Sequence, residues 1–381
     1  MKRKIAYITG TRADFGVMSS VLRSINSNPG LELIVYATGM HLMPEYGLTI
    51  KQVEELYPDV RKIDVVFRGN SKLGMAQFVA DFTSKFLDQL KHDQIDLILV
   101  LGDRVEMISA ALIAAYLGLP IAHVHGGDKT MTVDEVARHA ITKLSHLHFV
   151  ATKDSAERIK KLGEEDWRIH IVGAPSLDNT LSKKVPSKEE VYSFLKLDPN
   201  QKFILVLQHS TSNILGQAQN QIRETIEAVK DFDLPVVVVY PNADPGGQQI
   251  IQEIEKEKDN PQFNLFSSIK YEMFLGVEKE AAVWIGNSSS GIIESASFKT
   301  PVVNIGDRQK GRPQSGNVID VDYKKGEIKE AIKKSLYDED YRLRVSNISN
   351  LWGDGRAAEK VVKVLESLEI GPKLLTKQIT Y

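Results

Sequence analysis

The stretch Trp284–Pro313, WIGNSSSGIIESASFKTPVVNIGDRQKGRP, contains the pattern from which the fold can be predicted. The apolar run Ala282–Ile285 at its start is typical of a buried strand, and Val302–Ile305 is typical of a second one. Between them, a Gly-Asn pair and three serines lead into a helical pattern over Ser289–Phe298. A strand that enters a helix through small hydroxyl residues leaves backbone N–H groups available to an anion. Strand, turn, helix and strand in this order indicate a parallel α/β sheet.

Side chains around this turn are suited to a diphosphate. Ser288 and Ser289 add hydroxyl donors to the backbone N–H groups, and the helix dipole reinforces them. Arg308 and Arg312, in the basic loop after the second strand, supply fixed positive charge. Glu294, about one turn into the helix, is placed to accept hydrogen bonds from a ribose diol. Helix caps favour serine for structural reasons alone, so the prediction depends on the serines and the basic loop together.

Composition limits the class of protein. The 381 residues are 42% hydrophobic and 26% charged, which indicates a globular protein of two domains. A net charge of -2 gives no reason to expect nucleic acid or an anionic membrane as a partner. The chain has no cysteine, which excludes disulfides, thiolate metal sites and cysteine nucleophiles and is compatible with a cytoplasmic protein. The basic start is followed by an apolar run of a few residues, so we expect a first strand there and no signal peptide or membrane span.

Short apolar runs alternate with amphipathic segments along the whole chain, as in parallel sheets covered by helices on both faces. The expected strands are Ile5–Thr9, Leu33–Thr38, Ile63–Phe67, Leu97–Leu101, Ile121–Val124, Leu147–Ala151, Ile169–Val172, Phe203–Leu207, Val236–Tyr240, Phe263–Phe266, Val283–Ile285 and Val302–Ile305. The expected helices include Val17–Ile25, Leu73–Leu90, Met107–Leu117, Val136–Leu144, Gln219–Val229, Gln248–Lys256 and Met273–Lys279.

The alternation of apolar runs and amphipathic segments begins at the N-terminus and begins again in the second half of the chain. A polar stretch, Leu181–Leu197, separates the two halves. We therefore expect an N-terminal Rossmann-like domain, residues 1–182, and a C-terminal one, residues 183–381. The last helix, Ala357–Leu368, is expected on either domain. Doubly wound sheets bind ligands at the carboxyl ends of their strands, so two facing domains predict an active site in the cleft between them.

Two loops of the first half combine polar residues with a strand's carboxyl end. Gly10 permits a tight turn after the first strand, and Arg12 is then placed to reach a phosphate; a solvated arginine is the alternative. The spaced glycines of a dinucleotide site are not found there. Asp103 and Arg104 follow the strand Leu97–Leu101, where adjacent charges are costly unless they are used. Helix capping by Asp103 is the alternative.

A third loop, HVHGGD, contains His123, His125 and Asp128, and Asp134 and Glu135 follow it. Alternation places the two histidines on one face of a strand, which is compatible with a metal. No third ligand follows at metal spacing, so we expect no metal and no cofactor. Neighbouring carboxylates move each other's pKa values apart, so one can hold a proton while another is a base. The cluster therefore predicts a reaction in which a proton is removed at one point and delivered at another.

In the second half, His209 follows the strand Phe203–Leu207, where acid–base work or a phosphate contact is expected. Ser210 beside it lacks the nucleophile-elbow context of a hydrolase. Asn242, at the end of the next strand, is a candidate sugar or phosphate contact, with turn formation as the alternative.

Taken together, the motifs GTRADFG, LGDRVE, HVHGGD…VDEVARHAITKLSH, GNSSSGIIE and NIGDRQKGR resemble the hydrolysing UDP-N-acetylglucosamine 2-epimerases of sialic and legionaminic acid biosynthesis. The resemblance covers roughly Lys4–Asp320, and its most specific part is GNSSSG with GDRQKGR. It implies the glycosyltransferase-B architecture, two Rossmann-like domains that close on a UDP-sugar. It also implies conversion of UDP-N-acetylglucosamine to N-acetylmannosamine and UDP, by anti elimination to a 2-acetamidoglucal and hydration, for capsule or surface polysaccharide.

The resemblance also implies roles for individual residues. Asp103 matches the catalytic aspartate, Asp134 the acid of the following helix, with Glu135 close to it, and His209 the histidine of the second domain. Several relatives have glutamate where this chain has His125, so either His125 or Asp128 would supply the base. The residues that match nucleotide-sugar contacts are Arg12, Arg104, Asn242, Ser288, Ser289, Glu294 and Arg308.

Four other functions remain open. The non-hydrolysing epimerase has an HxEAG motif in place of HVHGG. A hydrolysing enzyme for UDP-N,N'-diacetylbacillosamine differs only at the far end of the sugar. A glycosyltransferase would share the diphosphate site but has no use for the carboxylates of the first half, and a non-catalytic nucleotide-sugar sensor has no use for Asp103, Asp134 and His209. We also expect a homo-oligomer, a dimer or tetramer, because apolar helices such as Met107–Leu117 suit an interface as well as a core.

Overall fold

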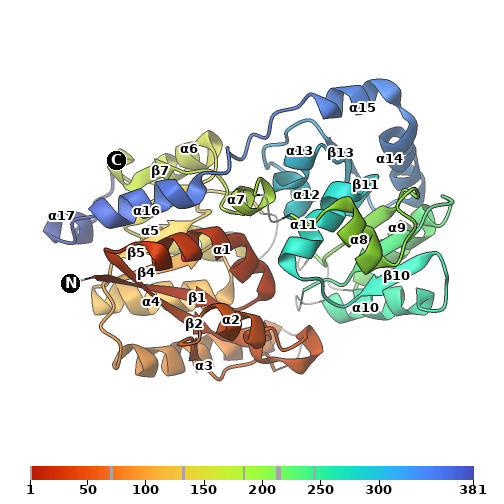
Figure 1. Cartoon of the computed structure of the whole chain (residues 1–381). Coiled ribbons are helices and arrows are strands. Elements are labelled where there is room, and N and C mark those ends of the chain that lie inside the picture. The colour runs from red at the N-terminus through yellow and green to blue at the C-terminus, as the bar shows by residue number, and fades with distance from the viewer. Residues whose placement is uncertain (1, 69–71, 131–133, 183–184, 212–215, 243–245) are drawn as a thin grey trace. The chain divides into compact units, whose positions relative to one another are not determined.

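The computed structural model describes residues 2–68, 72–130, 134–182, 185–211, 216–242 and 246–381. By its contacts the chain divides into two units (Figure 1). Unit 1 comprises Met1–Asp128, Asp134–Asn179 and Trp352–Tyr381, and unit 2 comprises Lys129–Val133 and Thr180–Leu351. Each unit is built around one parallel sheet.

In the described part of unit 1, seven parallel strands lie in the order β3-β2-β1-β4-β5-β6-β7. The strands are β1 Arg3–Thr9, β2 Leu31–Ala37, β3 Arg61–Lys62, β4 Leu97–Leu101, β5 Ile121–Val124, β6 Leu147–Val150 and β7 Ile169–Ile171. The helices are α1 Arg12–Ser27, α2 Ile50–Leu56, α3 Lys72–Leu90, α4 Val105–Leu117, α5 Asp134–Leu144, α6 Lys153–Lys161, α7 Ser176–Thr180, α16 Ala357–Ser367 and α17 Pro372–Leu375, with short 3-10 turns at Gly39–Leu42, Pro44–Tyr46 and Asp166–Arg168.

In the described part of unit 2, six parallel strands lie in the order β10-β9-β8-β11-β12-β13. The strands are β8 Ile204–Leu207, β9 Val236–Val239, β10 Phe263–Phe266, β11 Val283–Gly286, β12 Val302–Ile305 and β13 Val318–Val321. The helices are α8 Lys188–Leu195, α9 Ala218–Val229, α10 Gly247–Ile254, α11 Tyr271–Glu280, α12 Ser290–Ile293, α13 Ser295–Phe298, α14 Lys325–Tyr337 and α15 Glu339–Ser346, with a 3-10 turn at Glu255–Glu257.

Helices cover both faces of the sheet in unit 2, and alternate side chains of one strand enter different cores. Val236 and Val238 of β9 pack in one core with α9, α10 and α14. Val237 and Val239 pack in the other with α8 and α11. Since successive side chains of a strand point to opposite faces, a run of four valines is what a strand covered on both sides requires.

The end of the chain completes unit 1. Helix α16 lies beside α1, and the N- and C-termini both belong to this unit (Figure 1). Val361 and Leu365 of α16 are fully buried in the core that contains Val21 and Leu22 of α1. The carboxylate of Asp178 accepts hydrogen bonds from the first backbone N–H groups of α16, at 2.8 and 2.7 Å, and so caps this helix.

The strand orders locate the ligand-binding edge of each sheet. The order reverses between β1 and β4 in unit 1 and between β8 and β11 in unit 2. In open parallel sheets, ligands bind beside such a switch point, at the carboxyl ends of the two flanking strands. The loops that follow these four strands carry Arg12, Asp103 and Arg104 in unit 1, and His209 and Ser288 in unit 2.

Several predicted elements differ from the structure. The strand expected at Ile63–Phe67 is wrong, because β3 is only Arg61–Lys62 and the buried side chains that follow it lie on irregular backbone. The polar stretch 181–197 contains helix α8, which a capping box of Ser187 and Glu190 starts. The helix expected over Ser289–Phe298 is interrupted at Glu294, which leaves α12 and α13 with four residues each.

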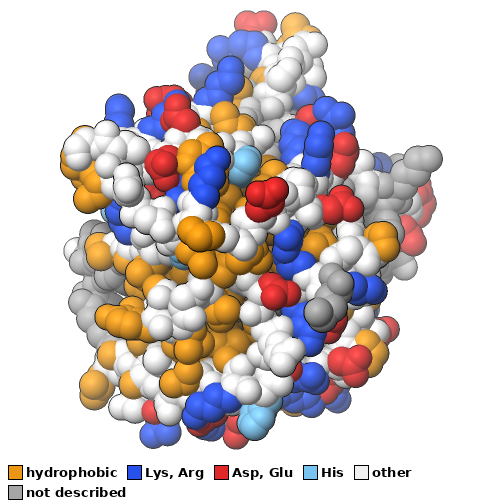
Figure 2. Space-filling view, turned by 90° about the vertical axis from the view of Figure 1, so that its left-hand side faces the viewer, with side chains coloured by type: hydrophobic (Ala, Val, Ile, Leu, Met, Phe, Trp, Pro, Cys, Tyr) orange, Lys and Arg blue, Asp and Glu red, His pale blue; other side chains and the backbone are white. Residues whose placement is uncertain are grey.

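Hydrophobic side chains gather on one face of the molecule between charged ones (Figure 2). On α4, Tyr116 is 88% exposed, and Leu112 and Leu117 are exposed as well. A homo-oligomer stays a prediction. Within the described ranges, no helix has both the length and the apolar composition to cross a membrane.

Candidate functional site

In unit 1 the loop after β1 packs directly against the start of α4. A side chain at Gly10 would lie 2.2 Å from the carboxylate of Glu106, which would have to move to make room for it. Glu106 is fully buried and accepts a hydrogen bond from Nε of Arg104 at 3.2 Å. Arg12, the first residue of α1, is mostly buried, and this desolvation lowers its pKa to about 10. The buried carboxylate of Glu106 therefore lies against the loop that precedes Arg12 and holds the side chain of Arg104.

The turn that carries Arg12 is fixed by a second network. Asp14 and Thr11 form a capping box, and the Asp14 carboxylate also accepts hydrogen bonds from the Gly10 and Thr11 backbone at 3.1 and 3.0 Å. The Thr9 hydroxyl links Asp14 to Nε2 of His41, whose Nδ1 lies 2.8 Å from the Thr49 hydroxyl. Burial lowers the pKa of His41 to about 4, so the ring is neutral.

The residues after β4 and β5 meet through Arg138 of α5. Arg138 forms an ion pair with Asp103 and donates a hydrogen bond to the His125 carbonyl at 2.6 Å. Arg138 is 4% exposed, so this charge is placed where little water competes for it. The predicted catalytic residues Asp103 and His125 are thus held by one guanidinium.

His125 and Asp128 form a buried pair. Nδ1 of His125 lies 2.7 Å from the Asp128 carboxylate, whose other oxygen accepts a hydrogen bond from the Ser155 hydroxyl at 2.6 Å. A carboxylate that accepts Nδ1–H fixes the tautomer and leaves Nε2 as the basic atom. His125 has φ +60°, an uncommon backbone for a residue with a side chain, which indicates a functional constraint.

His123 does not share this environment. It is the last but one residue of β5, while His125 has left the strand with a left-handed backbone, so the alternation that predicted one common face ends at Val124. The His123 ring is fully buried, with Nε2 at 2.7 Å from the Gly102 carbonyl and Nδ1 at 3.3 Å from the Thr142 hydroxyl. Burial lowers its pKa to about 3. It is a neutral structural histidine.

Asp134 and Glu135 occupy the first turn of α5, where negative side chains are favoured by the helix dipole. Glu135 lies 3.2 Å from Nε2 of His139, one turn further along. Both acids remain predicted proton-transfer groups, and they start the same helix that supplies Arg138.

In unit 2 the buried side chain of Asn287 joins the two loops at the switch point. Its Oδ1 accepts a hydrogen bond from the His209 backbone N–H at 2.7 Å, and its Nδ2 donates to the His209 carbonyl at 3.0 Å. Its own carbonyl accepts from Arg308 at 3.1 Å and from Gln309 at 2.8 Å. The structure therefore brings together the loops of His209, of the serines and of Arg308.

His209 is 5% exposed and is held neutral. Burial first, and the positive charge of Arg308 second, lower its pKa well below the usual value. Its Nδ1 accepts a hydrogen bond from the backbone N–H of Asn242 at 3.3 Å, which leaves Nε2 to carry the proton. The arrangement makes His209 a hydrogen-bond donor beside a cation.

The remaining predicted diphosphate residues lie around this centre or beside it. Ser288 and Ser289 are half-buried and directly follow Asn287, and Glu294 is 4% exposed. Nε of Arg312 donates to the Lys129 carbonyl at 2.6 Å. The helix-dipole contribution that the sequence predicted is small, because each of the two helices here has a single turn.

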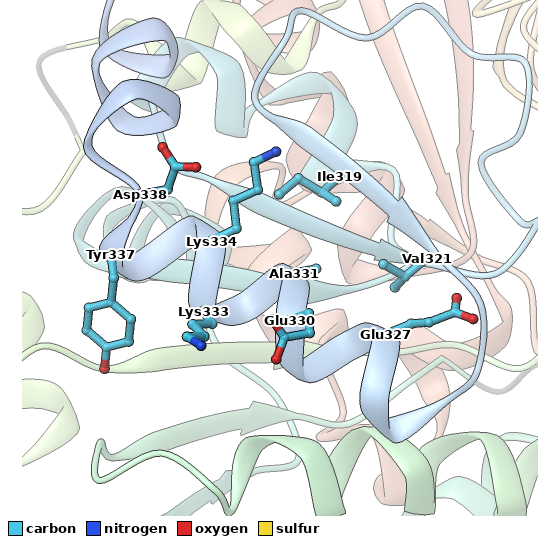
Figure 3. A pocket seen from close by; sticks show the side chains of 9 residues that line it. All are labelled: Ile319, Val321, Glu327, Glu330, Ala331, Lys333, Lys334, Tyr337 and Asp338. Carbon is cyan, nitrogen blue, oxygen red and sulfur yellow. The ribbon is translucent and has the colours of Figure 1, made fainter.

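Other features lie apart from these residues. A surface groove of about 760 Å³ runs between β13 and α14 (Figure 3), and no predicted site residue lines it. Its wall carries both signs of charge and the exposed ring of Tyr337. Within the described residues there is no group of three or more His, Asp or Glu side chains that could hold a metal ion.

Sequence reasoning missed the residues that position the others. The residues that contact the backbone or a neighbouring charge in this way are Glu106, Arg138, Asn287 and Gln309. The sequence offered two signals for such residues. Gly10 precedes a charged loop, and Arg138 follows the acidic pair Asp134 and Glu135 by one helical turn.

The two sheets, with helices on both faces and polar loops at each switch point, define a glycosyltransferase-B-like protein. Its fold is that of the UDP-GlcNAc 2-epimerase from Neisseria meningitidis bound to UDP-GlcNAc, with a TM-score of 0.81 and 21% identity over 95% of this chain and 99% of that one. The family model described as UDP-N-acetylglucosamine 2-epimerase matches residues 23–366. The chain belongs to the UDP-N-acetylglucosamine 2-epimerase family.

Two relatives are similar over most of their length. A UDP-N,N'-diacetylbacillosamine 2-epimerase (hydrolyzing) from Legionella pneumophila is 35% identical over 382 residues, covering 100% of both chains. A UDP-N-acetylglucosamine 2-epimerase from Neisseria meningitidis serogroup B is 33% identical over 334 residues, covering 87% of both.

Proposed function

We propose that this protein is a hydrolysing 2-epimerase that converts UDP-N-acetylglucosamine to N-acetylmannosamine and UDP. The observation that carries the proposal is that unit 1 has a histidine–carboxylate cluster at the carboxyl ends of β4 and β5, and unit 2 has a serine and arginine cluster at the carboxyl ends of β11 and β12. The first suits proton transfer at a sugar carbon and the second suits a departing diphosphate. The names of the two relatives above support the reaction class.

The proposed reaction has two stages. In the first, a base removes the proton at C2 while the C1–O bond breaks, so that UDP leaves and a C1=C2 double bond forms. In the second, water adds across that bond, with its oxygen at C1 and a proton at C2 on the face opposite to the one removed. Free N-acetylmannosamine results, and no oxidant or reductant is needed.

The described contacts favour particular roles. Nε2 of His125, with Asp128 behind the ring, is arranged as a base. Asp103, held by Arg138, is arranged as the second proton-transfer group, with Asp134 and Glu135 as the acids of the adjoining helix. Arg308, His209 and the serine hydroxyls are proposed to bind the diphosphate, and Arg12 and Arg104 to neutralise charge as the C1–O bond breaks.

Proton NMR in deuterated water tests the reaction directly. Free UDP with N-acetylmannosamine that carries deuterium at C2 would establish both hydrolysis and exchange. Epimer still attached to UDP would instead identify the non-hydrolysing reaction, and an unchanged substrate would rule out UDP-N-acetylglucosamine.

The second candidate substrate is UDP-N,N'-diacetylbacillosamine. The Legionella relative, which is similar over the whole chain, favours it. Both nucleotide sugars in one deuterated sample separate the two proposals, because the better substrate releases its deuterated product first in proportion to kcat/KM.

A further inference from the structure

A buried acid, Glu278, lies behind the serine turn of unit 2. It belongs to α11, its side chain is fully buried, and it is outside every motif that predicted the site. The hydroxyl of Ser290, the third serine of the turn, donates a hydrogen bond to Oε1 of Glu278 at 3.0 Å. Ser288 and Ser289 immediately precede Ser290, so the carboxyl group is linked to the backbone that carries the proposed diphosphate donors.

A second acid shares this environment. Glu294 follows Ser290 by one helical turn and is 4% exposed. Burial, and then the negative charge of Glu294, raise the pKa of Glu278 well above its usual value, while the Ser290 hydrogen bond acts in the opposite direction. Two carboxyl groups in one desolvated region resist ionising together, so Glu278 holds its proton to a higher pH than an ordinary glutamic acid does.

No described cation compensates Glu278. Helix α11 packs on α8 and α13. On α8 the ring of Tyr192 lies in the core, and burial first and the charge of Glu280 second raise its pKa. The ammonium group of Lys188 lies over that ring. On α11 itself, Lys279 lies 3.8 Å from Glu280. Glu294 is therefore the charged group that acts on Glu278.

We propose that Glu278 is a positioning residue of the UDP site: its carboxyl group accepts the hydrogen bond of the Ser290 hydroxyl and thereby fixes the serine turn. The inference rests on the proposed function, in which the serines bind the diphosphate. A leucine would fill the same space at lower desolvation cost, so an acid here is retained at a cost in stability.

If Glu278 has this role, the affinity for UDP should decrease as the pH rises. When the pH rises far enough to ionise Glu278, a second negative charge appears behind the turn that is proposed to bind a diphosphate. Affinity then falls, at most about tenfold per pH unit, as for any single proton linked to binding. UDP itself changes its charge only below about pH 7, because the last ionisation of a phosphate group is near 6.

The proposal is tested by calorimetric titration of wild type, E278Q and E278L with UDP between about pH 7 and pH 9.5. This range of about 2.5 units is chosen to cover a raised carboxyl pKa. The glutamine variant keeps an acceptor for Ser290 and cannot ionise. It should bind UDP within about twofold of wild type at pH 7 and show no alkaline loss. The leucine variant lacks the acceptor and should bind about tenfold more weakly at every pH. An alkaline loss that persists in E278Q, or wild-type affinity in E278L, would overturn the proposal.

Thermal unfolding separates this proposal from the function on which it rests. Because the folded-state pKa of Glu278 is raised, wild type should lose stability relative to E278Q as the pH rises from about 4.5 toward that pKa. Equal pH profiles of the two proteins would show that Glu278 holds no extra proton. A wild type that shows the stability difference but does not bind UDP would overturn the proposed function and the positioning role together, and leave only the shared buried proton.

Discussion

Asn287 makes two hydrogen bonds with the backbone of His209 and receives two more from Arg308 and Gln309 on its own carbonyl. A side chain of this kind contributes no chemistry, but it determines where the neighbouring groups lie. Arg138 and Glu106 have the same role in unit 1. In both sheets, the side chains proposed to meet the substrate are held by fully or almost fully buried partners that are not proposed to touch it.

Replacing Asn287 by alanine should disorganise the second cluster. The His209 N–H and carbonyl would be left buried without these partners, which costs about 1–3 kcal/mol for each group. We expect a lower free energy of unfolding in urea and at least tenfold weaker UDP binding by calorimetry. Asn200→Ala, at an exposed turn, is the control and should change neither. Wild-type affinity in Asn287→Ala would show that the loops keep their positions without this amide.

Asp103→Asn should separate catalysis from binding. The amide keeps the size of the carboxylate but neither accepts a proton nor balances the charge of Arg138, so turnover should fall by about three orders of magnitude or more. UDP affinity should stay within about threefold, because Asp103 belongs to unit 1 and the proposed diphosphate ligands to unit 2. UDP release and calorimetry measure the two quantities, with the exposed Asp166→Asn as control. Normal turnover would remove Asp103 from the mechanism.

Among the elements, the buried strands were predictable and the irregular ones were not. Apolar runs such as Leu97–Leu101 and Val236–Val239 have the composition that a strand covered on both faces requires. β3 and the left-handed His125 depend on contacts with distant residues, for which a local pattern has no signal. β13 and α14 were not predicted either, since the polar and apolar residues of VIDV give too short a pattern.

The positions of the candidate site residues could be predicted to a similar depth, and their roles stay predictions. Residues at the carboxyl ends of central strands, such as Asp103 and His209, follow from strand order and chemistry alone. Their partners are distant in sequence: Asp103 with Arg138, and His209 with Asn287. A sequence without the fold gives no reason to pair them.

The end of β11 requires glycine, and a pair of substitutions can show it. Gly286 has φ +142°, and a side chain there would lie 2.0 Å from the Leu207 carbonyl of β8. Gly286→Ala should therefore lower the free energy of unfolding by about 2–4 kcal/mol. Gly326→Ala in α14 is the matched control: its new side chain meets no atom within 4 Å, so it should stabilise the protein by about 0.5–1 kcal/mol. Equal urea midpoints for the two variants would contradict the structure at β11.

At the scale of the whole molecule, buried neutral histidines should make the fold sensitive to acid. His41 and His123 have pKa values of about 4 and about 3 because burial opposes their charged forms. In the unfolded chain they take up protons below about pH 6.5, so the stability that each provides is lost as the pH falls from there toward the folded-state pKa. Each of these two histidines should lower the free energy of unfolding by about 1.4 kcal/mol for every pH unit in that range.

The loss of stability in acid can be measured by urea unfolding at about pH 7 and pH 5. These conditions are about 2 units apart and lie on either side of the unfolded-state pKa of histidine. Between pH 7 and pH 5 the free energy of unfolding should fall by about 2 kcal/mol less in His123→Gln than in wild type. This difference is expected whatever the stability of the variant at pH 7. His92→Gln, at an exposed position, should change with pH as wild type does. The same pH response in all three proteins would mean that His123 does not stay neutral in the fold.

Unit 2 is inserted into unit 1, because Trp352–Tyr381 return to the first sheet after the second has been completed. During synthesis, the face of α1 that receives Val361 and Leu365 therefore stays uncovered while the ribosome makes the whole of unit 2. The strands of unit 2 are all present before α16 emerges, so the part encoded second is able to finish folding first. Until α16 has been synthesised, the N-terminal part of unit 1 must stay soluble with this face of α1 uncovered.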